Sequence, residues 1–233
     1  ARAGKGKGMS KATERRRERE ALIQIIEDEV RQTEVYTGRS HLDLRVLNAL
    51  EAVPRERFVP EHEIDCAYAN VPLPIGYRQT ISQPYIVALM TDLLEPRPSH
   101  RVLEVGTGSG YQAAVLSLLV DRVYSVEVVP ELAEQARQRL SDLGYGNVDV
   151  RQSDGNLGWP EHEPYDSIIV TAGARDVPEA LVEQLKPGGR LVIPVDANAH
   201  QMLKLIRKDE AGGVHSADVL PVAFVPLVEP PPG

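Results

Sequence analysis

The sequence predicts an α/β fold: a doubly wound, mostly parallel sheet with helices on both faces, an N-terminal helical addition and antiparallel C-terminal strands. Three observations lead to this prediction. An aliphatic run over residues 101–105 ends in a glycine-rich turn and continues as a helix. Further β-type runs follow along the chain, with helical segments between most of them. The 233 residues, 42% of them hydrophobic, suffice to bury the core of one large domain.

Charge divides the chain into a basic start and an acidic remainder. Residues 1–20 hold eight lysines and arginines against three glutamates, whereas the whole chain has a net charge of −8. We expect 1–20 to be a disordered or frayed tail, 21–98 to supply helices and a site loop, and 99–233 to form the α/β core, packed with 21–98 as one domain. The acidic body disfavours nucleic acid as a partner and suits a cationic small molecule.

Nothing in the sequence indicates a membrane segment, a metal site or a disulfide. No apolar stretch approaches the roughly 20 residues that span a bilayer, and no signal-peptide pattern is visible. Cys66 is the single cysteine, and the six histidines are scattered without metal-ligand spacing. We therefore expect a soluble, cytoplasmic protein without a metal, and the sequence predicts no particular oligomeric state.

Helical spacing and capping residues predict helices in the N-terminal part of the chain. Apolar residues recur at helical spacing over 22–30. A second helix is expected to begin after Asp43, a typical N-cap residue, and to end at Pro54. Residues 68–76 are too rich in proline for a helix and too interrupted for a central strand, so we expect them to wrap irregularly near a site.

Ser82 precedes a third predicted helix, which carries apolar residues over 86–94 and has Pro84 in its first turn. Its spacing favours an N-cap role, because a serine hydroxyl accepts hydrogen bonds from the free N–H groups of a helix start. A hydroxyl among those groups can also help to hold a carboxylate. The spacing alone leaves both roles open.

Gly106, Gly108 and Gly110 follow the first strand, and residues 111–120 read as the next helix. Glycine is needed where the backbone takes a positive φ or passes close to a ligand, and an anionic group fits against the N–H groups of such a turn. The dinucleotide fingerprint requires glycine or alanine where this chain has Tyr111, so nicotinamide and flavin cofactors are disfavoured. On its own, the turn is also compatible with a purely structural connection.

Polar residues stand in or after four predicted strands. Glu104 lies within the first strand, where a buried acid needs a partner or a ligand. Glu127 ends the second strand about 20 residues beyond the turn, where a ribose diol would lie. Asp154 and Gly155 follow the third strand, either to meet a base or as an ordinary turn, and Thr171 follows the fourth. Because these strand ends share one edge of the sheet, we expect a ligand there.

The C-terminal part of the chain is predicted to complete the sheet. A helix over 179–185 is closed by a Lys-Pro-Gly-Gly segment and followed by a fifth strand at 190–194. Apolar runs at 202–206 and 219–228 fit two further strands, joined by a turn at 209–213. We expect these two strands to form an antiparallel pair.

The glycine motif, Glu127 and the Asp154-Gly155 pair together resemble class I S-adenosylmethionine-dependent methyltransferases, which have a Rossmann-like fold. Further segments are similar to the protein-L-isoaspartate O-methyltransferase family, and this resemblance covers roughly residues 40–228. These segments are Pro54-Arg-Glu-Arg-Phe-Val-Pro60, Leu73-Pro-Ile-Gly76, Gln79-Thr-Ile-Ser-Gln-Pro-Tyr-Ile-Val-Ala88, Leu157-Gly-Trp-Pro160 and Leu185-Lys-Pro-Gly-Gly-Arg-Leu191.

The resemblance implies an enzyme that transfers a methyl group from S-adenosylmethionine to the free α-carboxylate of L-isoaspartyl residues in damaged proteins and peptides, which initiates their repair. It implies that Ser82 is the catalytic residue, which orients the carboxylate. Glu104 and Thr171 join the implied cofactor-binding residues because they lie at the same edge of the sheet. The implied residues are Gln79, Thr80 and Ile81 in a covering loop, Gly106, Thr107, Gly108 and Gly110 at the methionine moiety, Glu127 at the ribose, Asp154 and Gly155 at adenine, and Gln201 near the cofactor.

The chain departs from the family pattern mainly on the substrate side. Asn70 stands where the family often has Asp, Arg78 where Gly is common, Ser153 where Gly precedes the Asp-Gly pair, and Ala223 where Arg is frequent. Arg78 either attracts a substrate carboxylate or is a solvated loop residue. Whether the loop at 68–82 closes over a bound cofactor is not decided by the sequence.

Two other functions are compatible with the same motifs. A methyltransferase for another carboxylate or a small molecule would need the same cofactor residues. Methylation of nucleic-acid bases is disfavoured, because the Val170-Thr-Ala-Gly173 segment lacks an Asn/Asp-Pro-Pro-aromatic cluster. A non-catalytic cofactor-binding protein is the alternative from another class, and the intact glycines, Glu127 and Ser82 argue against it.

Overall fold

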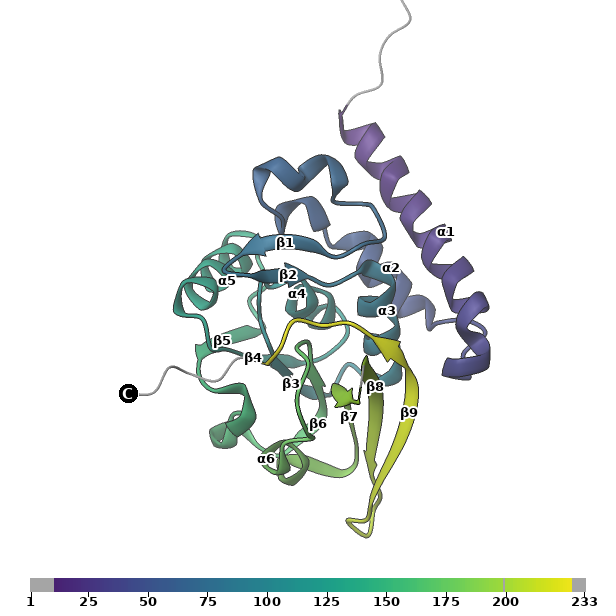
Figure 1. Cartoon of the computed structure of the whole chain (residues 1–233). Helices are drawn as coiled ribbons and strands as arrows, with labels where there is room; N and C mark the ends of the chain where they lie inside the picture. Colours follow the sequence, from purple (N-terminus) through teal and green to yellow (C-terminus); the bar gives the residue numbers. More distant parts are fainter. Residues whose placement is uncertain (1–10, 199, 228–233) are drawn as a thin grey trace, which may run out of the picture.

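A seven-stranded sheet forms the centre of the computed structural model, which describes residues 11–198 and 200–227 (Figure 1). From one edge to the other, its strands are β5 (Val148–Gln152), β4 (Arg122–Glu127), β3 (Arg101–Val105), β6 (Tyr165–Val170), β7 (Leu185–Ala197), β8 (His200–Lys208) and β9 (Val214–Val222). Neighbouring strands from β5 to β7 are parallel, whereas β8 and β9 pair antiparallel. The predicted fold class, including the antiparallel C-terminal strands, is confirmed.

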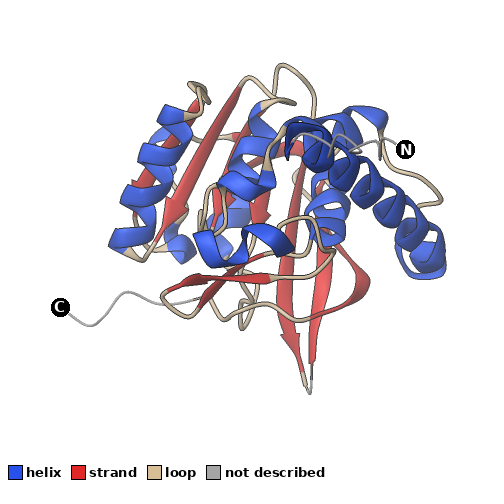
Figure 2. Cartoon of the chain, turned by 90° about the horizontal axis from the view of Figure 1, so that it is seen from above, coloured by secondary structure: helices blue, strands red, loops and turns tan. Residues whose placement is uncertain are grey.

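Helices pack on both faces of this sheet, and Figure 2 shows the long N-terminal helix along one side of the molecule. The α-helices are α1 (Lys11–Thr37), α2 (Leu44–Ala52), α3 (Pro84–Leu93), α4 (Tyr111–Ser117), α5 (Pro130–Asp142) and α6 (Glu179–Glu183), and short 3₁₀ helices lie at Arg55–Arg57, Glu61–Cys66, Gly155–Leu157 and Pro160–His162. One apolar cluster joins helices to one sheet face, with Ile26, Leu89 and Val102 among its buried members. A second cluster, on the other face, includes Leu103 and Leu181. No helix in the described ranges is long and apolar enough to cross a bilayer.

Helix α1 begins earlier than the sequence suggested. It starts at Lys11, so residues 11–20 are helical, which corrects the expected tail; residues 1–10 lie outside the described residues. Alternating charges stabilise this first part of the helix, because Arg15 pairs with Glu18 one helical turn away at 2.8 Å. The same arginine reaches Asp65 at 3.2 Å and so connects the helix to the 3₁₀ helix at Glu61–Cys66.

Helix α4 is shorter than predicted. It ends at Ser117 and not at residue 120. The next amides bond three residues back, as Leu118 N does to Val115 O at 3.3 Å, which is the tighter geometry typical of a helix end.

The C-terminal strands extend further than their apolar runs. Strand β7 begins at Leu185 and includes the Lys-Pro-Gly-Gly segment that was expected to close α6. A register shift between Tyr165 and Ser167 accommodates this segment beside β6. Strand β9 begins at Val214, because cross-strand pairing with β8 continues through polar residues up to the predicted turn at 209–213. Of the predicted 219–228 run, residue 228 lies outside the described residues.

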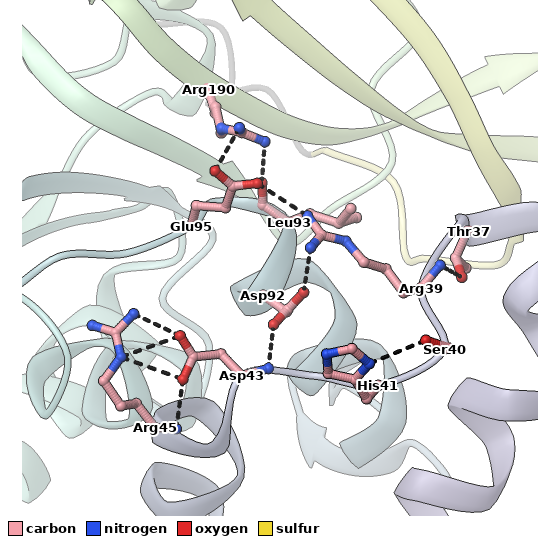
Figure 3. Close-up of polar contacts among 10 residues, drawn as sticks. All are labelled: Thr37, Arg39, Ser40, His41, Asp43, Arg45, Asp92, Leu93, Glu95 and Arg190. Atoms are coloured by element: carbon pink, nitrogen blue, oxygen red, sulfur yellow. Dashed lines mark hydrogen bonds and ion pairs between the residues drawn. The ribbon is translucent and has the colours of Figure 1, made fainter.

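A cluster of charged side chains ties the N-terminal helices to the sheet (Figure 3). The backbone N–H of Asp43, the confirmed N-cap of α2, donates to Asp92 Oδ1 of α3 at 2.7 Å. Arg39 pairs with Asp92 at 3.5 Å and with Glu95 at 3.2 Å, and Arg190 of β7 pairs with Glu95 at 2.6 Å. Burial raises the pKa of the Asp92 carboxyl, so this cluster combines a desolvated acid with two arginines.

Candidate active site

A two-stranded hairpin, β1 (Leu73–Gly76) and β2 (Gln79–Ile81), lies over the ends of β3 and β4 in the view of Figure 1. Leu73 pairs with Ile81, which corrects the irregular course expected for 73–76, whereas residues 68–72 are irregular as expected. Proline is tolerated here because β1 has a neighbour on one side only. At the hairpin tip, Tyr77 and Arg78 have φ values of 52° and 59°, a conformation that two-residue hairpin turns require. Arg78 is exposed and lines neither of the two cavities described below.

The glycine turn joins β3 to α4 in a conformation that excludes side chains. Gly106, Gly108 and Gly110 have φ values of 98°, 52° and 88°. A Cβ atom on Gly106 would lie 2.6 Å from Thr171 Oγ1, and that hydroxyl donates to the Gly106 carbonyl oxygen at 2.6 Å. Thr171, at the end of β6, therefore clamps the first glycine of the turn.

Glu127 holds the middle of the turn from the end of β4. Its Oε2 accepts the Gly108 N–H at 2.8 Å, and its Oε1 accepts the Val129 N–H at 3.0 Å. The side chain is largely buried, with 6% exposure. A carboxylate oxygen can accept more than one hydrogen bond, so both oxygens keep capacity for a ligand hydroxyl.

A cavity opens at the carboxyl ends of the neighbouring strands β3 and β6, the point at which strand order reverses in this sheet. Its walls come from the glycine turn, the ends of β3, β4 and β6, and the hairpin. Most of the residues proposed from the sequence line it: Gln79, Thr80, Ile81, Ser82, Gly106, Thr107, Gly108, Glu127, Gly155 and Thr171.

Four proposed residues do not line the cavity, and Gly110 and Asp154 are two of them. A Cβ atom on Gly110 would meet Leu140 Cδ1 of α5 at 3.2 Å, so this glycine allows close packing of the turn against a helix. Asp154 caps the 3₁₀ helix at 155–157, where its side chain accepts the Asn156 N–H at 2.9 Å. Asp154 thereby positions Gly155, which does line the cavity.

Gln201 of β8 also acts from outside the cavity. Its Oε1 accepts the Phe224 N–H at 2.6 Å, and its Nε2 lies 3.3 Å from the Phe224 carbonyl oxygen. The next residues, 225–227, line the cavity, and they pair with Gly173 through hydrogen bonds of 2.8 Å and 2.7 Å. No local sequence pattern marks residues 225–227 as site residues. Ser109 and Gln112 also line the cavity; they adjoin the glycine motif and could have been inferred from it.

Glu104 is fully buried beneath the turn. Ser125 Oγ donates to its Oε2 at 2.5 Å, and the Thr107 and Ser125 hydroxyls lie 2.6 Å apart. Its Oε1 has no partner among the described residues. Burial raises the pKa of Glu104 to about 8, so the carboxyl group is protonated at neutral pH. Glu104 does not line the cavity; Ser125 connects it to Thr107, which does.

Ser82 lies between β2 and α3, and the N-cap position belongs to Gln83. The cap interpretation of Ser82 is therefore wrong. Pro84 disfavours helical backbone at the residue before it, and Gln83 accordingly has an extended ψ of 133°. The Ser82 side chain is half-buried, lines the cavity and has no hydrogen-bond partner among the described residues.

Comparison with known proteins identifies the family that this architecture belongs to. The model of the Protein-L-isoaspartate(D-aspartate) O-methyltransferase (PCMT) family matches residues 28–231. The chain belongs to this family. The resemblance noted in the sequence and the prediction of a protein-L-isoaspartate O-methyltransferase are thereby confirmed at the level of the family.

Individual family members match nearly the whole chain. Protein-L-isoaspartate O-methyltransferase 2 of Polaromonas sp. (strain JS666 / ATCC BAA-500) is 57% identical over 199 residues, 85% of this chain and 94% of its own. The protein of the same name from Syntrophobacter fumaroxidans is 54% identical over 210 residues, with coverages of 90% and 85%. A solved protein-L-isoaspartate O-methyltransferase superposes with a TM-score of 0.79 at 30% identity, covering 91% of this chain and 66% of that chain.

A second solved structure shares the fold at lower identity. It is a protein-L-isoaspartate O-methyltransferase from Plasmodium falciparum in complex with S-adenosyl-L-homocysteine, with a TM-score of 0.73 and 23% identity. It covers 90% of this chain and 98% of its own. The family's fold, with its parallel sheet and antiparallel C-terminal strands, thus recurs over the full length of a distant member.

Proposed function

We propose that this chain transfers the methyl group of S-adenosylmethionine to the free α-carboxylate of L-isoaspartyl residues in damaged proteins and peptides, the step that initiates their repair. Membership of the family supports the reaction class, since relatives named for it are more than 50% identical over most of the chain. The observation that carries the proposal is the cavity, which surrounds one space with the glycine turn, Glu127 and Ser82.

The cavity has the donor and acceptor groups that S-adenosylmethionine needs. We assign Gly106, Thr107 and Gly108 to the methionine moiety and Glu127 to the ribose hydroxyls, because its oxygens accept one backbone N–H each and can accept further bonds. Gly155 is assigned to adenine, since a Cβ atom there would lie 2.4 Å from Val105 Cγ1 and close this end of the cavity. Gln79, Thr80 and Ile81 would cover the cofactor from β2.

Other residues proposed from the sequence would position these groups from behind. Thr171 clamps Gly106, and Gly110 packs the turn against α5. Asp154 caps the segment that carries Gly155, and Gln201 holds the chain that leads to residues 225–227. Glu104 fixes the Thr107 hydroxyl through Ser125.

In this mechanism, the protein has to align a weak nucleophile. When bound, the cofactor supplies an electrophilic methyl group on a sulfonium. The acceptor carboxylate is already an anion near neutral pH, so the protein needs no strong general base. Its residues have to hold the carboxylate in line and exclude water. The Ser82 hydroxyl would donate to one carboxylate oxygen and leave the other directed at the methyl group.

We further propose that residues 21–98 and 99–233 act as one domain around this site. Ser82 and the hairpin come from the first segment, whereas the glycine turn and Glu127 come from the second. The same apolar cluster also contains buried residues of both segments, such as Ile26 and Val102. Neither segment has a complete cavity wall of its own.

Transfer of labelled methyl from S-adenosylmethionine to two matched peptides tests the proposed function. One peptide contains isoaspartate and the other normal aspartate, and the product is scored as a base-labile methyl ester. We expect label on the isoaspartyl peptide only. Label on neither peptide, with binding of S-adenosylhomocysteine established by calorimetry, would contradict the proposal.

Substitution of Ser82 tests its assigned role. Ser82→Ala should lower kcat on a saturating isoaspartyl peptide by about tenfold, because a hydrogen bond to a charged group is lost. Its affinity for S-adenosylhomocysteine should stay within a factor of about two of the wild-type value, since that product carries no acceptor carboxylate of the substrate. Ser141→Ala, at an exposed position of α5, is the matched control. Unchanged kcat in Ser82→Ala would exclude this role.

A further inference from the structure

A groove lies beside the cofactor cavity and shares a wall with it. Thr80 and Ser82 line both spaces. The groove is bounded by α1, by the start of α3 and by residues 220–224, which are the end of β9 and the two residues after it. Helix α1 contacts both α3 and β9, so three segments far apart in the sequence meet there.

The walls of this groove are largely apolar and carry a single charge. Tyr85 and Ile86 line it from α3, and Leu220 and Phe224 line it from the other side. Glu29 of α1 is the one charged residue among the side chains that line it. An apolar groove of this kind contacts aliphatic or aromatic groups, and its one carboxylate fixes where a polar group of a ligand can lie.

Glu29 is held in place without being neutralised. Asn70 Nδ2 donates to its Oε2, and Gln83 Nε2 lies 3.3 and 3.4 Å from its two oxygens. Both partners are neutral amides. Within residues 11–198 and 200–227, no lysine, arginine or histidine forms an ion pair with it. A half-buried carboxylate with a fixed orientation and no counter-charge is a binding point for a cation.

Asn70 makes this arrangement possible in this chain. Its Nδ2 donates to Glu29, while its Oδ1 accepts the Tyr85 N–H at 2.9 Å, so one side chain joins α1 to the start of α3. An aspartate at this position could not donate and would repel Glu29. The departure at position 70 that the sequence shows thus has a definite consequence for the charge of the groove.

We propose that the groove binds the residues that flank isoaspartate in the substrate, and that Glu29 selects peptides with a lysine or arginine there over peptides with an acidic residue. This inference rests on the proposed function, because Ser82 would fix the reacting carboxylate at the shared wall and the peptide would continue from it into the groove. The apolar walls contact the aliphatic stem of the basic side chain, and its charged end reaches Glu29.

Initial-rate kinetics with a set of isoaspartyl peptides test this selection. The peptides are identical except for lysine, glutamine or glutamate at one flanking position, varied on each side of isoaspartate in turn. On one of the two sides, kcat/KM for the lysine peptide should exceed that for the glutamate peptide by about three- to tenfold at low salt, because one weak attraction is replaced by a repulsion of similar size. The difference should appear in KM and shrink as salt is raised.

Variants of α1 show whether Glu29 is responsible. Glu29→Gln should remove the preference for lysine, whereas Glu29→Asp retains the charge and should retain the preference in the same direction. Glu34→Gln removes a charge from an exposed position of the same helix and should change nothing. A thermal unfolding curve for each variant identifies any that fail to fold.

The outcomes separate this inference from the proposed function. If no isoaspartyl peptide is methylated, whatever its flanking residues, the proposed function itself fails. If the wild-type chain methylates all peptides with equal kcat/KM, or if the preference for lysine survives in Glu29→Gln, the selection by Glu29 is overturned and the proposed function stands.

Discussion

The two spaces that share Thr80 and Ser82 differ in what builds them. The cavity is bounded on one side by the backbone of the glycine turn, whose Gly108 N–H is held by Glu127 at 2.8 Å. The groove beside it is lined mainly by side chains of α1, α3 and the end of β9 with the residues after it, and its single charge comes from Glu29. The difference teaches that the glycine turn has little room for added side-chain atoms, whereas the groove could change its preference through one residue.

The largest expected effect on binding comes from adding one carbon atom to the glycine turn. Gly106→Ala should weaken binding of S-adenosylhomocysteine by about 10- to 100-fold, because its φ of 98° is strained for any other residue and its Cβ would lie 2.6 Å from Thr171 Oγ1. Isothermal titration calorimetry measures the affinity. Gly144→Ala is the matched control, since Gly144 has a φ of 84° but nothing within 4 Å of its Cβ position. Wild-type affinity in Gly106→Ala would show that the turn can adapt.

A smaller loss of affinity for S-adenosylhomocysteine is expected when only one hydrogen-bond acceptor of the cavity is changed. Glu127→Gln should weaken binding of S-adenosylhomocysteine by about tenfold, because the amide replaces one of two oxygens that accept backbone N–H groups and removes the charge. The same titration serves as the measurement. Glu131→Gln, an exposed residue in the first turn of α5, is the control. Equal affinities of the two variants would argue against a ribose contact at Glu127.

At the groove, a change at Asn70, which contacts Glu29, should affect stability and leave cofactor affinity unaltered. Asn70→Asp loses the bond that Asn70 donates to Glu29 and places two carboxylates together, at a cost of about 1–2 kcal/mol in the free energy of unfolding. Urea unfolding measures this cost. In the Glu29→Gln background, Asn70→Asp should cost clearly less, because the repulsion is absent. Equal costs in both backgrounds would mean that the two residues are not coupled.

The last prediction concerns the pH dependence of stability and involves Glu104, beneath the cavity. The pKa of Glu104 is about 8 in the folded chain against a reference value of 4.5, so between these values the folded protein keeps a proton that the unfolded chain has released. Unfolding then releases a proton, and the contribution of Glu104 to stability falls as pH rises from about 4.5 to about 8.

Thermal unfolding of Glu104→Gln at several pH values measures this dependence. Relative to wild type, the Tm of Glu104→Gln should rise by about 10 °C over this range, since each pH unit changes the stability difference by about 1.4 kcal/mol and 1 kcal/mol corresponds to about 2–4 °C for a chain of this size. Glu131→Gln should follow the wild-type pH profile. A Glu104→Gln profile parallel to that of wild type would show that Glu104 is ionised in the folded protein.

The cavity could be predicted from the sequence because its main parts are local. Gly106, Gly108 and Glu127 each stand at or just beyond the end of an aliphatic run, and parallel strands bring such ends together. The Asp43 cap and the antiparallel C-terminal strands follow from equally local patterns. Boundaries were less predictable, because cross-strand pairing extends β7 and β9 beyond their apolar residues.

The groove could not be predicted from local patterns. Glu29 sits among charged residues of a long helix, and only the packing of α1 on α3 brings it to Asn70 and Gln83. Residues 225–227 reach the cavity through pairing with Gly173, which is distant in the sequence. The prediction of Ser82 as a helix cap failed for a steric reason. Its spacing resembles that of a cap, but the steric demand of proline moves the cap to the following residue and leaves the Ser82 hydroxyl free.

If cofactor and peptide occupy the two spaces as proposed, the wall of Thr80 and Ser82 that both would contact would make their binding mutually dependent. By linkage, whatever factor a bound cofactor contributes to peptide affinity, the peptide contributes equally to cofactor affinity. Methylation then alters both at once, since the esterified product has lost the negative charge that the Ser82 hydroxyl would hold. Chemistry at this wall would thus loosen the peptide and, where the two ligands favour each other's binding, speed exchange of the spent cofactor.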